Sequence, residues 1–316
     1  MNSMSEDGVT FGGGIWGKKP EPGGARGTRG AARIGRLRLL LGLSALAGIA
    51  GAGPAMAADI SACGATISKP GFYQVTQDLT ASGGDCIDVN AARTIVFLNG
   101  HNLTGAGSGI GVSFSSRAKS SFLEGGNATI GGFAIGVADE ASYVHGDNFN
   151  ANGNTTGGLL VSGAQYSTFS DFQASGNGSY GVHFLMGANN VAESAQASSN
   201  RSYGIWLDGA RGARLDNFDT EQNAMAGVYI GCATNGPGTA CSGGNHLGSA
   251  NQVYDGFADG DGPYGIAIDA NATANLVTSV EAMNNKSSDL LDLSKCGSNS
   301  WFGNAFASAT PSGCIN

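Results

Sequence analysis

Hydrophobic and polar residues alternate along short stretches of this chain, and the stretches recur at a regular interval. Residues 177–184 read N-G-S-Y-G-V-H-F, and residues 200–207, one interval further on, read N-R-S-Y-G-I-W-L. In G-I-W-L-D, side chains alternate inward and outward with the two-residue period of a β-strand. Only a few Gly, Asn and Ser residues separate such stretches, which is typical of tight turns. The pattern predicts short strands joined by turns.

The interval extends over most of the chain. Glycines that begin similar apolar tetrads stand at Gly109, Gly132, Gly158, Gly181, Gly204, Gly227 and Gly265, most of them one interval apart, with a longer step before the last. A fixed period of this kind indicates a solenoid, and it is too short for two helices and their turns. We therefore expect an all-β chain: a right-handed parallel β-helix with about 23 residues and three short strands per coil.

A row of asparagines follows the same period. Asn154, Asn177, Asn200 and Asn223 each stand shortly before a repeat glycine, and Asp261 and Asn285 continue the row. If each period is one coil, these side chains stack at the strand spacing of about 4.8 Å and satisfy buried turn amides. Every coil then needs the same residue at the same corner.

The opening of the repeat region resembles a known family. The run A-C-G-A-T-I-S-K-P-G-F-Y-Q-V-T-Q-D-L-T, followed by D-C-I-D-V-N and F-L-N-G-H-N-L-T-G, is similar to that of bacterial exported β-helix repeat proteins of the pectate-lyase-like superfamily. The resemblance runs from Ile60 to the C-terminus and implies the fold. It implies no single activity, because that superfamily includes lyases, hydrolases, epimerases and adhesins.

The segment 1–57 is interpreted as a leader. Five arginines from Arg26 to Arg38 precede an apolar run and P-A-M-A-A, which is the order of a signal peptide with a long basic n-region, cleaved after Ala57. The apolar run is short and rich in glycine, so we expect no stable membrane span. The protein is then exported, to the periplasm or the outside. The segment 58–316 forms one domain, with an N-terminal cap at 58–85, an inserted loop at 231–246 and a C-terminal cap at 294–316.

Charge and cysteines fit export. Without the leader's 7 basic and 3 acidic residues, the chain's 16 and 24 become 9 and 21, a formal net charge of −12. Such a surface repels phosphate backbones, which argues against nucleic acid as a partner. Six cysteines in an exported chain suggest disulfides, and 15 pairings are open. The simplest set joins sequence neighbours: Cys63 with Cys86, Cys232 with Cys241, and Cys296 with Cys314.

The strand phase predicts one aromatic row on the outside of the solenoid. The first outward positions of successive coils are Leu160, His183, Trp206, Tyr229 and Ala267, and the second include Asp208 and Asp269. One interpretation is a platform on which sugar rings stack, while the carboxylates and Arg211 or Arg214 bond hydroxyls. The other is cross-coil packing alone. The insertion directly after Tyr229 favours the first, because loops on rigid scaffolds concentrate function.

Acidic residues suggest two places for a cation. Glu193 and Asp216 stand one period apart and should stack, and Y-D-G-F-A-D-G-D-G-P carries Asp255, Asp259 and Asp261. Calcium, which takes oxygen ligands, is the ion that suits them. A solvated acidic surface is the simpler interpretation of both.

The sequence supports three functions. We favour a polysaccharide-binding protein that uses the row of His183, Trp206 and Tyr229 together with Asp269. The second is a polysaccharide lyase or glycoside hydrolase, for which Asp208 with Arg211 or Arg214 are the candidate catalytic residues, although no catalytic signature of the superfamily is present. The third is a non-catalytic structural or adhesive envelope protein.

Overall fold

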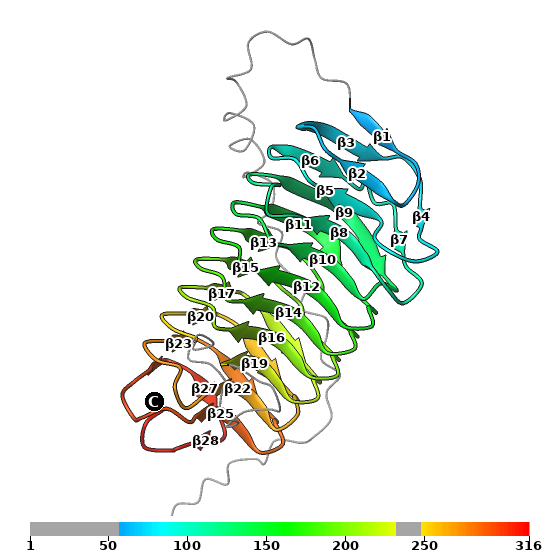
Figure 1. Cartoon of the computed structure of the whole chain (residues 1–316). Helices are drawn as coiled ribbons and strands as arrows, with labels where there is room; N and C mark the ends of the chain where they lie inside the picture. The colour runs from blue at the N-terminus through cyan, green and yellow to red at the C-terminus, as the bar shows by residue number, and fades with distance from the viewer. Residues whose placement is uncertain (1–56, 232–247, 316) are drawn as a thin grey trace, which may run out of the picture. The chain divides into compact units, whose positions relative to one another are not determined.

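The computed structural model describes residues 57–231 and 248–315. Within these ranges the chain forms β-strands joined by turns and contains no helix, so no helix there could cross a membrane. Residues 57–315 belong to one compact unit. Its strands stack coil upon coil from the N-terminal to the C-terminal end, and every pairing is parallel (Figure 1). The predicted parallel β-helix is confirmed.

The second sheet, so called because it receives the second strand of each coil, has 11 strands. In stacking order they are β2 (Ala65–Ile67), β5 (Ile87–Val89), β8 (Ile110–Phe114), β10 (Ile135–Asp139), β12 (Gly157–Ser162), β14 (Tyr180–Leu185), β16 (Tyr203–Asp208), β19 (Ala226–Ile230), β22 (Tyr264–Ile268), β25 (Ser288–Asp292) and β28 (Ala309–Thr310).

The first sheet stacks in the same way along a second side of the solenoid. Its strands are β1 (Ala58–Ile60), β3 (Gly71–Val75), β6 (Thr94–Phe97), β9 (Phe122–Gly131), β11 (His145–Asn150), β13 (Thr168–Ser170), β15 (Val191–Glu193), β17 (Arg214–Asp216), β20 (Gln252–Tyr254), β23 (Leu276–Thr278) and β26 (Ser300–Phe302).

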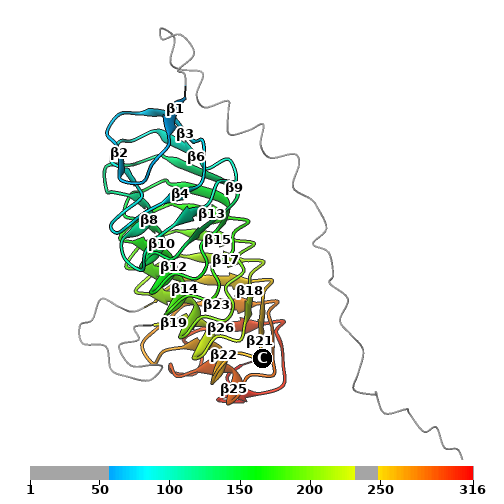
Figure 2. The ribbon, with the colours of Figure 1, turned by 90° about the vertical axis from the view of Figure 1, so that its right-hand side faces the viewer.

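The sequence predicted a third strand in every coil, but the third side of the solenoid is less regular. Near the C-terminal end it is a sheet of four strands, β18 (Asp219–Glu221), β21 (Phe257–Asp259), β24 (Glu281–Met283) and β27 (Ala305–Phe306) (Figure 2). Near the N-terminal end, β4 (Leu79–Thr80) and β7 (Leu103–Thr104) pair there, and β7 also pairs with the end of β9. Between them the third side is reduced to single bridges such as Gln173 to Gln196.

The strand register confirms the predicted period. Leu160 lies opposite His183, His183 opposite Trp206, and Trp206 opposite Tyr229. The step to Ala267, across the insertion, keeps the same register. Residues distant in the chain are therefore neighbours along the stack, as the repeat requires.

The core is a set of inward rows, one of which contains a carboxyl group. The inward residues of the second sheet include Ile205 and Leu207, which have no exposed surface. Asp139 occupies the same row, between Phe114 and Val161, and is also 0% exposed. Its Oδ1 accepts a hydrogen bond from the N–H of Ala141 at 2.8 Å. Burial raises its pKa to about 7, although the Ser167 hydroxyl and the Ala141 N–H lower it in part.

The predicted asparagine row is a hydrogen-bonded ladder. The backbone N–H of Asn154 donates to Oδ1 of Asn177 at 2.9 Å, Asn177 donates to Asn200 in the same way at 2.9 Å, and Asn200 to Asn223 at 3.0 Å. Each Nδ2 also bonds a backbone oxygen of the neighbouring coil, for example Asn200 to Ala174 at 3.1 Å. The ladder satisfies buried groups that turns would otherwise leave unpaired.

The repeat glycines are explained by the same corner. A Cβ on Gly204 would lie 2.6 Å from the Gly227 oxygen, 2.7 Å from Nδ2 of Asn223 and 2.8 Å from the Ala197 oxygen. These atoms are backbone or a fixed ladder side chain, so they cannot move aside. Glycine recurs here because the ladder leaves no room for a side chain.

A second ladder escaped the sequence interpretation. At the corner between the second and first sheets, the N–H of Ser167 donates to Oδ1 of Asn190, Asn251 to Asn275, and Asn275 to Asn299, at 2.9–3.0 Å. The regular spacing of Asn251, Asn275 and Asn299 is visible in the sequence, but no recurring glycine motif accompanies it.

Several strands make up the N-terminal end, where the sequence predicted a cap at 58–85. Within it, β3 is an inner strand that pairs with β1 on one side and β6 on the other. The edge strand is β1, which pairs with β3 alone and buries Ile60. The disulfide of Cys63 and Cys86, whose Cα atoms are 4.1 Å apart, joins neighbouring coils as predicted.

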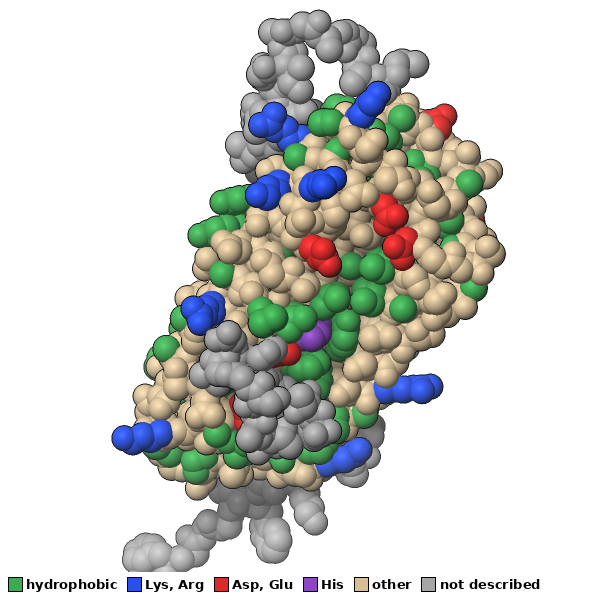
Figure 3. Space-filling view, in the orientation of Figure 1, with side chains coloured by type: hydrophobic (Ala, Val, Ile, Leu, Met, Phe, Trp, Pro, Cys, Tyr) green, Lys and Arg blue, Asp and Glu red, His purple; other side chains and the backbone are tan. Residues whose placement is uncertain are grey.

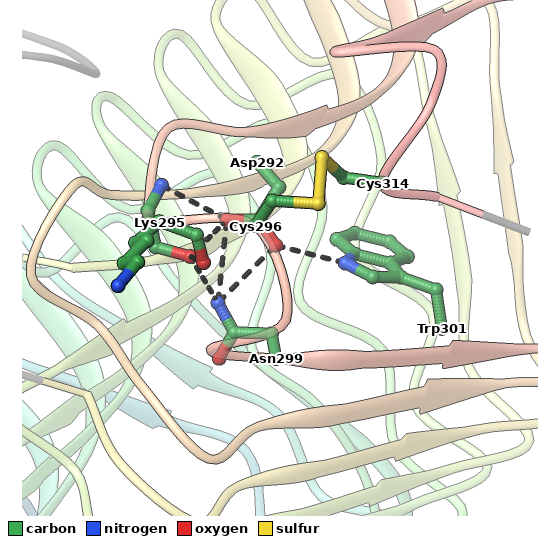
Figure 4. The surroundings of a disulfide bond; sticks show 7 residues. Asp292, Lys295, Cys296, Asn299, Trp301 and Cys314 are labelled. Carbon is green, nitrogen blue, oxygen red and sulfur yellow. Dashed lines mark hydrogen bonds between the residues drawn. A yellow bond between two sulfur atoms is a disulfide. The ribbon is translucent and has the colours of Figure 1, made fainter.

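The C-terminal end is closed by a buried carboxylate and a disulfide (Figure 4). Asp292 accepts hydrogen bonds from Nε1 of Trp301 at 2.9 Å and from the hydroxyl of Ser294 at 2.6 Å, and Asn299 donates to it as well. The predicted bond between Cys296 and Cys314 is present. Trp301 is buried, whereas Phe302 is 74% exposed.

Three predictions fall on other parts of the chain. The leader, the inserted loop and the pair of Cys232 and Cys241 lie outside the described residues, except for Ala57 and Gly231 at their margins.

Candidate functional site

The outer face of the second sheet brings the predicted row together. His183, Trp206 and Tyr229 come from β14, β16 and β19 and occupy directly paired positions. Figure 3 shows hydrophobic side chains gathered in a strip across this side of the molecule, with a histidine within the strip and acidic side chains beside it. The geometry of the row therefore agrees with the strand phase read from the sequence.

The rings of the row face one another rather than the solvent. The His183 and Trp206 rings are stacked, with centroids 4.0 Å apart and planes 2° from parallel. Tyr229 stacks on Tyr203 at 5.0 Å, and Tyr180 meets His183 edge-on at 4.9 Å. Aromatic side chains at neighbouring positions of parallel strands pack face to face along the stack. An open row of ring faces, as the platform interpretation requires, is not what forms.

The members of the row differ in how much of their surface is exposed. His183 is 7% exposed and Tyr229 is 0% exposed, so neither ring offers a surface for a sugar. Trp206 is half-buried, and its Nε1 donates to the carbonyl oxygen of Gly231 at 2.8 Å. This bond and the stack on His183 fix the indole. Trp206 is thus the aromatic residue of the row that reaches the surface.

Two carboxylates flank the row. Oδ2 of Asp208 lies 3.5 Å from Nε2 of His183, and Oδ2 of Asp269 accepts the hydroxyl of Tyr229 at 3.1 Å. Burial raises the pKa of Tyr229, and the nearby Asp269 raises it further, so the phenol stays protonated and keeps donating. Both carboxylates are 6% exposed. Asp208, Gly231 and Asp269 occupy the same position in three successive coils, so the two carboxylates are two coils apart.

The two candidate arginines lie elsewhere. Arg211 is in the turn that leaves the second sheet and is exposed. Arg214 is in β17 of the first sheet, where its guanidinium pairs with Asp216 and lies 5.6 Å from the ring centre of Tyr254. The structure therefore does not place Arg214 beside Asp208.

The predicted acidic column lies on the first sheet. Glu193 is paired with Asp216, as expected, and Glu124 with Asp147 in earlier coils. Burial raises the pKa of Glu124, and the charge of Asp147 adds to the rise. Asp216 forms an ion pair with Arg214, so a protein cation already lies beside this column.

The three aspartates of the expected calcium loop serve different parts of the fold. Asp261 is 0% exposed and belongs to the asparagine ladder, where its Oδ1 accepts the N–H of Asn223 at 2.8 Å. Burial raises its pKa to about 7. Asp255 is exposed in a turn, and Oδ1 of Asp259 accepts Nδ2 of Asn284 at 2.8 Å. Among the described residues, no three His, Cys, Asp or Glu side chains are grouped so that they could hold a metal.

The tyrosines that precede the repeat glycines, which the sequence did not mark as part of the row, lie beside it. Tyr203 packs with Tyr229 and Trp206 in a second hydrophobic cluster, outside the main core. Burial raises the pKa of Tyr180 and Tyr203 to about 12. Their signal in the sequence is the recurrence of a tyrosine directly before the glycine in neighbouring coils, at Tyr180 and Tyr203.

Comparison with known proteins identifies no family. No protein-family model matches the chain, and no curated protein does. Similar solved structures include a double mutant of the periplasmic alginate epimerase AlgG, at 13% identity over 66% of this chain and 61% of that chain, with a TM-score of 0.41. The Dettilon tailspike protein is 11% identical over 78% of this chain and 60% of that chain, with a TM-score of 0.46.

A further similar structure is the A-module of a mannuronan C-5 epimerase from Azotobacter vinelandii, at 14% identity over 80% of this chain and 75% of that module, with a TM-score of 0.40. The chain covers 61% and 60% of the length of the first two. At these identities and TM-scores, no activity and no residue role is transferred from these proteins to this chain.

Proposed function

We propose that the protein is exported and binds a polysaccharide along the outer face of the second sheet. The observation that carries the proposal is Trp206, a partly exposed indole held in one orientation by His183 and by the Gly231 carbonyl. A fixed aromatic side chain binds with little loss of conformational entropy. The two disulfides in the described residues fit an oxidising compartment.

The surroundings of Trp206 suit a linear polymer. Half-buried apolar side chains continue its face toward the N-terminal end, at Ile110, Ile135, Leu160 and Leu185. Ile110 and Ile135 are paired neighbours, Leu160 lies in the row of Trp206, and Leu185 is paired with Asp208, so apolar surface extends over successive coils about 4.8 Å apart. Sugar rings present apolar C–H faces, which this strip of apolar side chains beside Trp206 would contact.

Replacing Trp206 with alanine is expected to weaken glycan binding at least about tenfold, because central aromatic anchors dominate binding energy. A glycan array with the wild type and Trp206→Ala measures this directly. Tyr143→Ala is the control, because Tyr143 is 51% exposed and lies in a distant turn. A thermal melt of each variant separates lost binding from lost folding. Binding by neither wild type nor variant, or equal binding by both, contradicts the proposal.

A catalytic function is the second candidate, and one pair of contacts favours it. Asp208 approaches Nε2 of His183, while Asp269 stands two coil steps away, about 10 Å at the backbone. Inverting glycosidases place their two carboxyl groups about 6.5–9.5 Å apart. Incubation with uronate and neutral polymers, followed for unsaturated or reducing ends, tests this. Products that disappear in Asp208→Asn support an enzyme, and their absence with every polymer leaves binding as the function.

A further inference from the structure

A shallow groove lies on the opposite corner of the solenoid, between the first sheet and the third side near the C-terminal end. Its volume is about 460 Å³, and it is lined by Asp255, Phe257, Ser279, Glu281, Gly303 and Ala305, among others. Asp255, Ser279 and Gly303 occupy the left-handed turn position of three successive coils, with φ of 45°, 56° and 65°. The groove thus runs along the stack, beside β21, β24 and β27.

Phe257 is the exposed aromatic residue of this groove. It is 51% exposed, and no other ring of the described residues stacks on it, unlike the rings of the second sheet. A phenylalanine has no polar atom that would benefit from water, so half of its surface in solvent is unfavourable. Its ring face is available to a ligand in a way that those of His183 and Tyr229 are not.

Carboxylates surround this ring. Within the third side, Phe257 lies between Asp219 of the preceding coil and Glu281 of the following coil. Asp255 lines the same groove, and no Lys or Arg does among its described lining residues. Burial raises the pKa of Asp219, and the charges of Glu221 and Asp259 raise it further, which shows how much negative charge is crowded here.

We infer that this groove binds a cationic amino-sugar polymer, with a sugar ring stacked on Phe257 and its ammonium groups beside Glu281 and Asp255. An ammonium over an aromatic face is attracted by the ring quadrupole, and the carboxylates add to that attraction. Uronate polymers carry the wrong sign for this groove. The site is separate from the one under Proposed function and does not depend on it.

The inference is tested by calorimetric titration of the full protein with a glucosamine oligomer. We expect binding that weakens as salt rises toward about 1 M, where the Debye length falls to about 3 Å. Phe257→Ala should weaken binding about tenfold and Glu281→Gln about threefold. Tyr143→Ala and Glu140→Gln are the matched controls, since both residues are exposed in other coils, and each should bind like wild type.

Three outcomes overturn the inference. The first is unchanged binding by Phe257→Ala. The second is equal binding of the fully N-acetylated oligomer, because the ammonium groups would then be irrelevant. The third is equally tight, Phe257-dependent binding of a lysine oligopeptide, which would mean that the groove recognises cations rather than sugars. Trp206→Ala serves as a cross-check: it should leave glucosamine binding intact, so failure of one site is distinguishable from failure of the other.

Discussion

Asn200→Ala is expected to destabilise the protein by about 4 kcal/mol, because the substitution leaves several buried polar groups without partners. Asn200 is 1% exposed. Its Oδ1 accepts the backbone N–H of Asn177, and its Nδ2 donates to the carbonyl of Ala174. An unsatisfied buried donor or acceptor costs about 1–3 kcal/mol. Chemical denaturation followed by far-UV circular dichroism measures the change.

The control is Asn271→Ala, since Asn271 is exposed in a turn and should change stability by no more than about 0.5 kcal/mol. Comparable losses in both variants would mean that the ladder contributes no more than an ordinary surface asparagine.

Asp261 shows how the ladder accepts a carboxylate, and this gives the experiment a second arm. Its Oδ2 lies 3.3 Å from the hydroxyl of Thr220, which occupies the place that alanines such as Ala174 hold in earlier coils. We expect Asn200→Asp to be destabilising, because a carboxylate cannot donate to the Ala174 carbonyl. Adding Ala174→Thr should recover part of the loss, as a double-mutant cycle would record. Additive effects would contradict this account of the Thr220–Asp261 pair.

Asp139→Asn is expected to stabilise the protein by about 4 kcal/mol above pH 7 and to have little effect near pH 4. The carboxyl group has a pKa of about 7 in the folded chain, against about 3.9 when unfolded. Between these values the folded state keeps a proton that the unfolded state has released. Stability from this group therefore falls as pH rises from about 4 to about 7, by about 1.4 kcal/mol per unit.

Asparagine keeps the Oδ1 that accepts the Ala141 N–H but carries no ionisable group. The measurement is the difference in urea midpoint between Asp139→Asn and wild type at about pH 4 and about pH 8. The pKa of Asp261 is also raised to about 7. Because both proteins contain Asp261, its contribution to stability cancels when their urea midpoints are subtracted. Asp59→Asn is the control, because Asp59 is exposed in β1. An Asp139→Asn advantage of the same size at both pH values would show that ionisation is not its cause.

The sequence predicted the ladder and the outward row from the same observation. Once the period is taken as one coil, Asn177 must lie over Asn200 and His183 over Trp206, and both follow from the register alone. The pairs of Cys63 with Cys86 and Cys296 with Cys314 agree with the simplest set of pairings. Asp139 could not be predicted as a core carboxyl, because the register aligns Gly136, rather than Gly132, with Gly158.

The chemistry of the candidate site was harder to foresee than its residues. Periodicity says that Trp206 stands beside His183, but not whether two rings turn their faces to each other or to solvent. Periodicity also cannot show that Arg214 and Asp208 lie on different sheets. The chain turns from one sheet to the other at the corner that contains the ladder of Asn190 and Asn251, and the repeat does not mark that corner. The groove at Phe257 arises where the chain turns from the first sheet into the third side.

The sequence by itself determined the coil length, the parallel stacking and the residues that share a row, because a repeat converts spacing along the chain directly into contact between strands. Only the tertiary structure decided which outward side chains remain open. Exposure depends on the orientation of each ring and on how neighbouring coils fill the space above it. Trp206 and Phe257 reach the surface for that reason, whereas Tyr229, in the same kind of position, does not.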